Sequence, residues 1–298
     1  MRTIGILLYC VIALILSACD SQIEGKDSSN KETGSWGYEL INSDIQREGG
    51  KPIKIAVLDS GINSSLPELK DRVIKSFDVI ENDEVTKDSF NHGTSVAAII
   101  GGERINNEIQ GINQHSILYD VQVLNENGLG DVSTVVDGIE WCIKEKVDVI
   151  NISFGFEKNY PELESVIHKA LDEGIIIVAA SGNTLGLNVE YPAKYQGVIS
   201  VASINKDSKR SSVSAKGKID YAAPGEDILS INNQGQIGLL KGTSFAAPML
   251  TGVISVLMSH SDEDITYKNI HNFLKPFVQD LGEKGHDEEF GNGVIKLR

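Results

Sequence analysis

Residues 53–59 read IKIAVLD, an apolar and β-branched run that ends in a carboxylate. Similar runs are SILYDVQVL (116–124), VDVINIS (147–153), GIIIVAAS (174–181) and GVISVAS (197–203). Several are apolar throughout, which is typical of parallel strands covered on both faces. Segments with a helical pattern alternate with them or follow them: GTSVAAIIGG (93–102), VSTVVDGIEWCIKEK (132–146), ESVIHKALDEG (164–174) and the stretch after Ser244. We therefore expect an α/β fold whose mostly parallel central sheet is covered by helices on both faces.

The balance of charged residues narrows the classes of function. The 298 residues include 42 Asp or Glu and 27 Lys or Arg, which gives a net charge of −15. This balance argues against a nucleic-acid partner, because phosphates favour basic surfaces. It would attract cationic peptides and repel acidic ones.

The first 19 residues, MRTIGILLYCVIALILSAC, have the layout of a secretory signal, with one basic residue, an apolar run and then small residues. The apolar run is shorter than the roughly 20 residues that span a bilayer. The string LSAC resembles a bacterial lipobox, so we expect residues 1–18 to be a signal peptide and Cys19 to be lipidated. That would anchor the protein at the extracytoplasmic face of the bacterial cell membrane. An uncleaved anchor and plain secretion remain the alternatives.

Downstream of Cys19 the composition predicts two regions. Residues 19–35 are polar and are expected to form a flexible tether, and residues 36–298 have the composition of a folded domain. Residues 36–298 contain one cysteine, Cys142. It has no partner for an intrachain disulfide and is expected to be a small buried apolar residue.

Four polar residues stand where strands end or helices begin. Asp59 ends the first strand, His92 opens a helix, Asn183 follows a strand, and Ser244 lies in KGTSFAAPM (241–249) at the head of an apolar helix. Each has an ordinary structural interpretation as a turn residue or a helix cap. Together they supply the hydroxyl, imidazole, carboxylate and oxyanion donor that acyl transfer by serine needs.

The local strings around these residues are DSG, HGTS, SGN and GTSFAAP, and their order and content resemble the signatures of subtilisin-like serine proteases. The resemblance covers roughly residues 36–297. It implies a three-layer subtilisin-like fold and a serine endopeptidase with Asp59, His92 and Ser244 as the catalytic triad. Asn183 and the backbone N–H of Ser244 would stabilise the oxyanion. Pro248 is expected to be tolerated because it lies near the helix start.

The resemblance also implies where a peptide or protein substrate would bind. It would lie as an added strand between two segments of the chain. The residues implied to pair with it are Ser153, Phe154 and Gly155 on one side and Gly128, Leu129 and Gly130 on the other.

The sequence departs from the family pattern at Ser95 and in the loop at 103–113. Ser95 stands where the family often has a second histidine, which should matter little for the chemistry. The loop that carries a calcium site in some members looks shortened at 103–113, although Glu68 could still be a ligand. No cofactor is required for the chemistry and no metal site is predicted; a structural calcium is conceivable. A monomer is expected.

The biological role is open at this stage between processing of an exported peptide, for example by a lantibiotic-type leader peptidase, and scavenging of extracellular protein. The alternative to an enzyme is a catalytically inactive binding protein that kept the fold. A lipase of the α/β-hydrolase plan is excluded, because there the serine comes first, on a Gly-x-Ser-x-Gly elbow.

Overall fold

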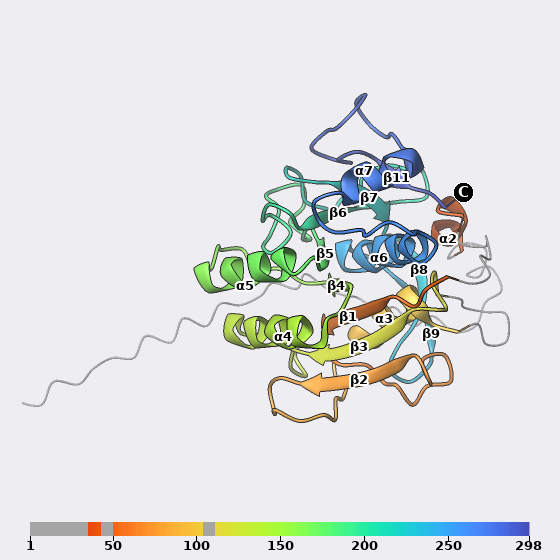
Figure 1. The fold of residues 1–298 in the computed structure, drawn as a ribbon. Coiled ribbons are helices and arrows are strands. Elements are labelled where there is room, and N and C mark those ends of the chain that lie inside the picture. Colours follow the sequence, from red (N-terminus) through yellow and green to blue (C-terminus); the bar gives the residue numbers. More distant parts are fainter. Residues whose placement is uncertain (1–34, 43–49, 104–110, 298) are drawn as a thin grey trace, which may run out of the picture.

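A nine-stranded sheet forms the centre of the protein in the computed structural model, which describes residues 35–42, 50–103 and 111–297. The strand order is β10-β11-β7-β6-β5-β4-β1-β3-β2 (Figure 1). Its strands are β1 (Lys54–Asp59), β2 (Val73–Asp78), β3 (Ile117–Gln122), β4 (Val149–Ile152), β5 (Ile176–Ala180), β6 (Ile199–Ile204), β7 (Tyr221–Pro224), β10 (Val278–Gln279) and β11 (Val294–Ile295). All neighbours run parallel except β10 and β11. The predicted α/β class and mostly parallel sheet are confirmed.

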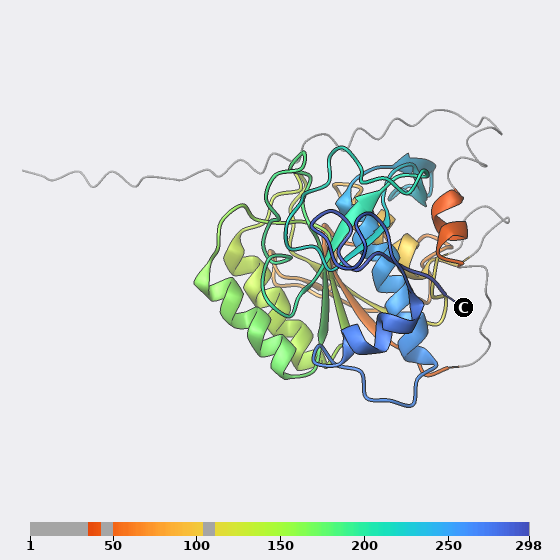
Figure 2. The same ribbon diagram turned by 90° about the horizontal axis from the view of Figure 1, so that it is seen from above.

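Helices cover both faces of this sheet, as Figure 2 shows. On one face lie α4 (Val132–Glu145) and α5 (Pro161–Asp172), which pack against each other. On the other face, α3 (Gly93–Gly101) packs on β1, and α6 (Thr243–Ser259) packs on the middle strands β4 to β7. The other helices of the described residues are the short elements α2 (Trp36–Leu40), α7 (Ile270–Leu274) and η1 (Lys275–Phe277).

Burial explains why some elements could be predicted and others not. Every residue of β4, β5 and β6 is buried, as their continuous apolar runs indicate. The edge strand β2 is largely exposed or half-buried and reads VIKSFD. Its polar residues interrupt the apolar pattern, so the sequence did not predict this strand. The short strands β7, β10 and β11 and the hairpin of β8 (Ile228–Ile231) and β9 (Ile237–Leu240) were also not predicted.

The carboxyl ends of the central strands meet at one edge, and this is what assembles the site. In register, Leu58 of β1 pairs with Ile152 of β4, and Ile152 pairs with Ala179 of β5. The residues that follow these three positions therefore emerge side by side at the same edge of the sheet.

The predictions for the amino terminus, including the signal peptide, the lipidated Cys19 and most of the tether, lie outside the described residues. Within the described part of the chain, none of the helices has the length and apolar character needed to cross a membrane. Cys142 is fully buried on α4, and burial raises the pKa of its thiol, which confirms its assignment as a buried apolar residue.

Candidate active site

Asp59 and His92 form a buried pair at the carboxyl end of β1. The Oδ1 atom of Asp59 lies 2.7 Å from Nδ1 of His92 and accepts a second hydrogen bond, of 2.8 Å, from the N–H of Ser60. Asp59 is 1% exposed and His92 is 6% exposed. A carboxylate in this position fixes which ring nitrogen carries the proton and stabilises the imidazolium.

His92 is the residue immediately before α3, and a polar network holds that junction. Asp88 accepts a 2.8 Å hydrogen bond from the hydroxyl of Ser60, which in turn accepts one of 3.0 Å from the N–H of Gly93. Asp88 also accepts a bond from the N–H of Thr94. The start of α3 is therefore tied to the turn that follows β1, which keeps the imidazole beside Asp59.

The electrostatics of His92 favour its protonated form. Burial is the largest effect and lowers the pKa of its imidazole. The charge of Asp59, the hydrogen bond to it and the charge of Asp88 act in the opposite direction and together raise the pKa above its usual value. An imidazole held in this way is a stronger proton acceptor than one in water.

Ser244 lies at the second position of α6 and is 6% exposed. The ring of Phe245, the next residue, contacts the ring of His92 with centroids 5.3 Å apart, which brings the start of α6 against the imidazole. The Nε2 atom of His92 is buried and has no hydrogen-bond partner among the described residues. The atom that would take a proton from serine is therefore uncommitted.

The simpler interpretation, in which Thr243 or Ser244 caps the helix, is wrong. The residue before α6 is Gly242, and no side chain caps this end. Pro248 is the sixth residue of α6 and not part of its first turn, so closeness to the helix start does not explain why it is tolerated. Pro248 has no backbone N–H, so the carbonyl of Ser244, four residues earlier, lacks the donor that it would have in a regular helix.

Asn183 follows β5 and is locked to the start of α6. Its Oδ1 atom accepts hydrogen bonds from the N–H of Thr243 at 3.0 Å and from its hydroxyl at 3.1 Å. Its Nδ2 atom donates to none of the described residues. Gly242 has a φ of 137°, and a methyl group there would lie 3.0 Å from Nδ2, so glycine is needed for both conformation and space.

The two segments predicted to flank a substrate follow β3 and β4, the strands that pair with the two edges of β1. Gly128 packs on Phe90, whose ring lies 6.3 Å from that of His92, and Leu129 beside it is an exposed apolar residue. The residues of the other segment continue directly from β4 and are buried: Ser153, Phe154 and Gly155. Gly130 lies against Val123 and Leu124 at the end of β3.

Three acidic residues near the site were not singled out from the sequence. Asp88 could have been noticed four residues before His92, and Asp120 as a lone carboxylate in the apolar run ILYDVQVL. Asp120 accepts hydrogen bonds from the N–H of Ile62 and the hydroxyl of Thr86. Burial raises its pKa to about 8. The third residue, Glu190, lies in NVEYPAKY (188–195) and was not noticed.

The side chains of Ser95 and Glu68, two other residues discussed from the sequence, form no hydrogen bond with Asp59 or His92. Ser95 donates a 2.7 Å hydrogen bond to the carbonyl of Ile231 and so ties α3 to β8. The Oε2 atom of Glu68 is buried without a hydrogen-bond partner among the described residues. The loop that would complete a calcium site with Glu68 lies mostly at 104–110, outside those residues. Within the described ranges, no group of three or more His, Cys, Asp or Glu side chains is arranged to hold a metal ion.

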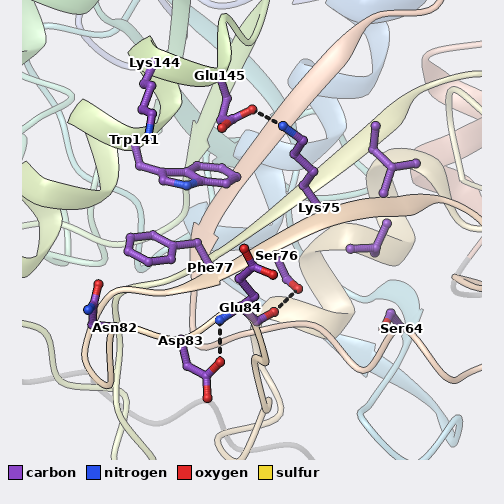
Figure 3. Close-up of a pocket in the computed structure, with 12 residues that line it drawn as sticks. Ser64, Lys75, Ser76, Phe77, Asn82, Asp83, Glu84, Trp141, Lys144 and Glu145 are labelled. Atoms are coloured by element: carbon purple, nitrogen blue, oxygen red, sulfur yellow. Dashed lines mark hydrogen bonds and ion pairs between the residues drawn. The ribbon is translucent and has the colours of Figure 1, made fainter.

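A separate surface cavity of about 750 Å³ lies along the edge strand β2 (Figure 3). Phe77 and Trp141 stack in it with ring centroids 5.6 Å apart, and Lys75 pairs with Glu145 across it. None of the predicted site residues lines this cavity. The candidate active site is therefore the polar group at the ends of β1 and β5, and the cavity plays no part in it.

A doubly covered parallel sheet with a buried Asp–His pair beside a serine at a helix start is the arrangement of a subtilisin-like protein. Residues 50–293 match the sequence model of the subtilase family, peptidase S8. The protein belongs to this family.

Individual relatives agree with this assignment. Over 280 residues the chain is 34% identical to the "Minor extracellular protease Epr" of Bacillus subtilis (strain 168), covering 92% of this chain but 43% of that protein. It is 38% identical over 254 residues to the "Subtilisin" of Bacillus pumilus, covering 84% of this chain and 90% of that one. The solved structure of "a cold adapted subtilisin-like serine proteinase" superposes with a TM-score of 0.77 at 24% identity, over 89% of this chain and 99% of the other. This last likeness supports the subtilisin-like fold.

Proposed function

We propose that the protein is a serine endopeptidase in which Ser244 is the nucleophile, His92 the general base and acid, and Asp59 the residue that orients His92. The observation that carries the proposal is the buried 2.7 Å contact between Asp59 and His92, set against the first turn of α6. The family assignment and the similarity to named proteases support it. An inactive binding protein would have no need to keep a charged pair buried.

In this mechanism the hydroxyl of Ser244 attacks the carbonyl carbon of the scissile bond while Nε2 of His92 takes its proton. The tetrahedral oxyanion accepts hydrogen bonds from the N–H of Ser244 and from Nδ2 of Asn183. His92 then gives its proton to the leaving amine, which leaves an acyl group on Ser244. Water, deprotonated by His92, attacks this ester, and the acid product and the free serine are released.

The substrate would bind as an extended strand, with its backbone between 128–130 on one side and 153–155 on the other. Main-chain pairing of this kind is insensitive to side chains, so selectivity has to come from the space that each side chain enters. Monomeric protein is sufficient, since all the residues in these roles come from one chain.

For location, we propose export followed by lipidation of Cys19, so that the peptidase acts at the extracytoplasmic face of the membrane. Similarity to a protease named as extracellular is consistent with export. Its substrates would then be exported peptides or proteins, either a precursor cut at one place, such as a lantibiotic-type leader peptide, or extracellular protein degraded generally. Structural calcium bound through Glu68 remains compatible with the buried, unpartnered Oε2 atom of that residue.

The experiment that tests the function is hydrolysis of an internally quenched peptide library by the full chain and by Ser244→Ala, with thermal unfolding as a check on folding. We expect Ser244→Ala to lose nearly all activity at unchanged melting temperature. A fluorophosphonate reagent should label Ser244 in the wild-type protein. An inactive wild-type protein that does not react with the reagent, or labelling confined to another serine, would refute the proposal.

A further inference from the structure

Glu190 lies beside two glycines that border the proposed reaction centre. A methyl group placed on Gly155 would lie 2.8 Å from Oε2 of Glu190, and one placed on Gly182 would lie 2.6 Å from the same atom. The carboxylate therefore lies between these two residues. A side chain on either glycine would displace it.

The two glycines mark where one substrate side chain has to go. Gly155 ends the segment proposed to pair with the substrate backbone, and Gly182 immediately precedes Asn183, the proposed donor to the scissile carbonyl. With these roles, the substrate residue that carries this carbonyl would lie between the two. Its side chain would thus be directed toward the space between Gly155 and Gly182, where the carboxylate of Glu190 lies.

The backbone around Glu190 is fixed by hydrogen bonds on both sides. The N–H of Glu190 donates to the carbonyl of Ser181 at 3.0 Å. Tyr191, the next residue, exchanges two hydrogen bonds with Phe156, of 2.7 and 2.8 Å. The backbone of Glu190 is therefore joined to both of the segments that contain the glycines, which fixes the point from which its side chain extends.

The carboxylate itself has no partner in the described part of the chain. No Lys, Arg or His there lies within ion-pair distance of it. Lys194, which is close in sequence, lies over the ring of Tyr191 instead, 5.5 Å from its centroid. Partial burial, with a smaller effect from the charge of Glu157, raises the pKa of Glu190 to about 7. An ionised, half-buried carboxyl without a counter-ion is costly to the fold, and either a bound proton or a cationic ligand can relieve that cost.

We propose that Glu190 selects a cationic side chain, Lys or Arg, at the substrate residue immediately before the scissile bond. The inference rests on the proposed peptidase function, since the position of that residue follows from the roles of Ser244 and Asn183. An ammonium or guanidinium group would form a charge-assisted hydrogen bond with the carboxylate in a partly desolvated place. An uncharged side chain would leave the carboxylate desolvated and unpaired, and an acidic one would be repelled. The net charge of −15 favours the same substrates at long range.

The test is a series of quenched peptides that are identical except for Arg, Lys, Gln, Leu or Glu before the scissile bond, with the cleaved bond identified by mass spectrometry. We expect kcat/KM for Arg and Lys to exceed that for Gln and Leu on the order of tenfold to a hundredfold, with Glu the slowest. Glu190→Gln keeps the size of the side chain and should lower the Arg-to-Gln ratio at least tenfold. Glu190→Lys should raise the Glu-to-Arg ratio.

Glu157→Gln is the matched control, because it removes a nearby charge that is exposed. It should change the Arg-to-Gln ratio less than threefold. A wild-type preference for Leu or Gln, or an unchanged ratio in a folded Glu190→Gln variant, would overturn the role of Glu190 while leaving the peptidase function standing. Cleavage of none of the peptides by the wild-type protein would overturn both.

Discussion

Thr251 of α6 donates a 2.8 Å hydrogen bond to Oδ1 of Asn151 on β4, and both side chains are fully buried. Asn151 in turn donates to the hydroxyl of Ser153 at 2.9 Å. The helix that carries Ser244 is thus fixed to the segment that would bind the substrate backbone. This relationship couples the position of the proposed nucleophile to the position of the segment proposed to bind the peptide.

Breaking this link should affect stability and activity together. Thr251→Val keeps the shape but leaves the Oδ1 atom of Asn151 without its donor, so we expect the free energy of unfolding to fall by about 1–3 kcal/mol. We also expect a lower kcat/KM, because Ser153 loses its fixed neighbour. Urea unfolding and peptide kinetics measure both effects. Ser259→Ala, near the far end of the same helix, is the control and should leave kcat/KM unchanged.

Asn183→Ala should reduce kcat on the order of 10²- to 10³-fold with a small change in KM, because the donor acts on the oxyanion and not on the bound peptide. This magnitude is known for subtilisin, a relative of this protein, and is carried over from it. Steady-state kinetics on one peptide are sufficient. A change confined to KM would contradict the role of Asn183.

The activity should rise with pH through the titration of His92. Only the neutral imidazole can accept the serine proton, and the raised pKa of His92 places the midpoint of this rise above pH 6.5. In Asp59→Asn the charge that raises the pKa is absent, so the midpoint should move to lower pH and kcat should fall on the order of 10⁴-fold. The kcat/KM profile between pH 5 and pH 9 tests this; an unmoved midpoint in the variant would exclude the coupling.

Asp120 should make the folded protein less stable as the pH rises. Its pKa of about 8 in the folded state lies above the ordinary value of 3.8, so the folded chain holds a proton that the unfolded chain has released. Its contribution to stability is therefore lost between about pH 4 and pH 8. Asp120→Asn should flatten the dependence of the melting temperature on pH across this window. Asp172→Asn, at the exposed end of α5, should not.

Cys19→Ser should release the protein from membranes or block its maturation, because the thioether that would carry the diacylglyceryl group cannot form. Fractionation of cells that express the two forms, followed by detection of the full domain, measures the partition. Unchanged membrane association in the variant would count against lipidation. The peptidase activity of the released variant should equal that of the wild-type domain.

The sequence predicted the elements that have a local residue pattern and missed the features that depend on which residues pack together in the fold. Buried central strands such as β5 are apolar throughout, and glycine and serine at the start of α6 stand out against its apolar body, so both could be found. The edge strand β2 could not, because exposure removes the apolar signal. Glu190 and Asp120 were missed for a related reason: a carboxylate has no mark in the sequence that tells burial from exposure, and only the packed chain shows it.

Pro248 gives the first turn of α6 an unusual mechanical character. The carbonyl of Ser244 has no N–H four residues later to accept from, so small displacements of this proposed nucleophile would break no helical hydrogen bond at that carbonyl. The long body of the helix remains stiff, while its tip is anchored by Asn183. The missing bond thus lies in the single turn where the covalent bond to the substrate would form and break.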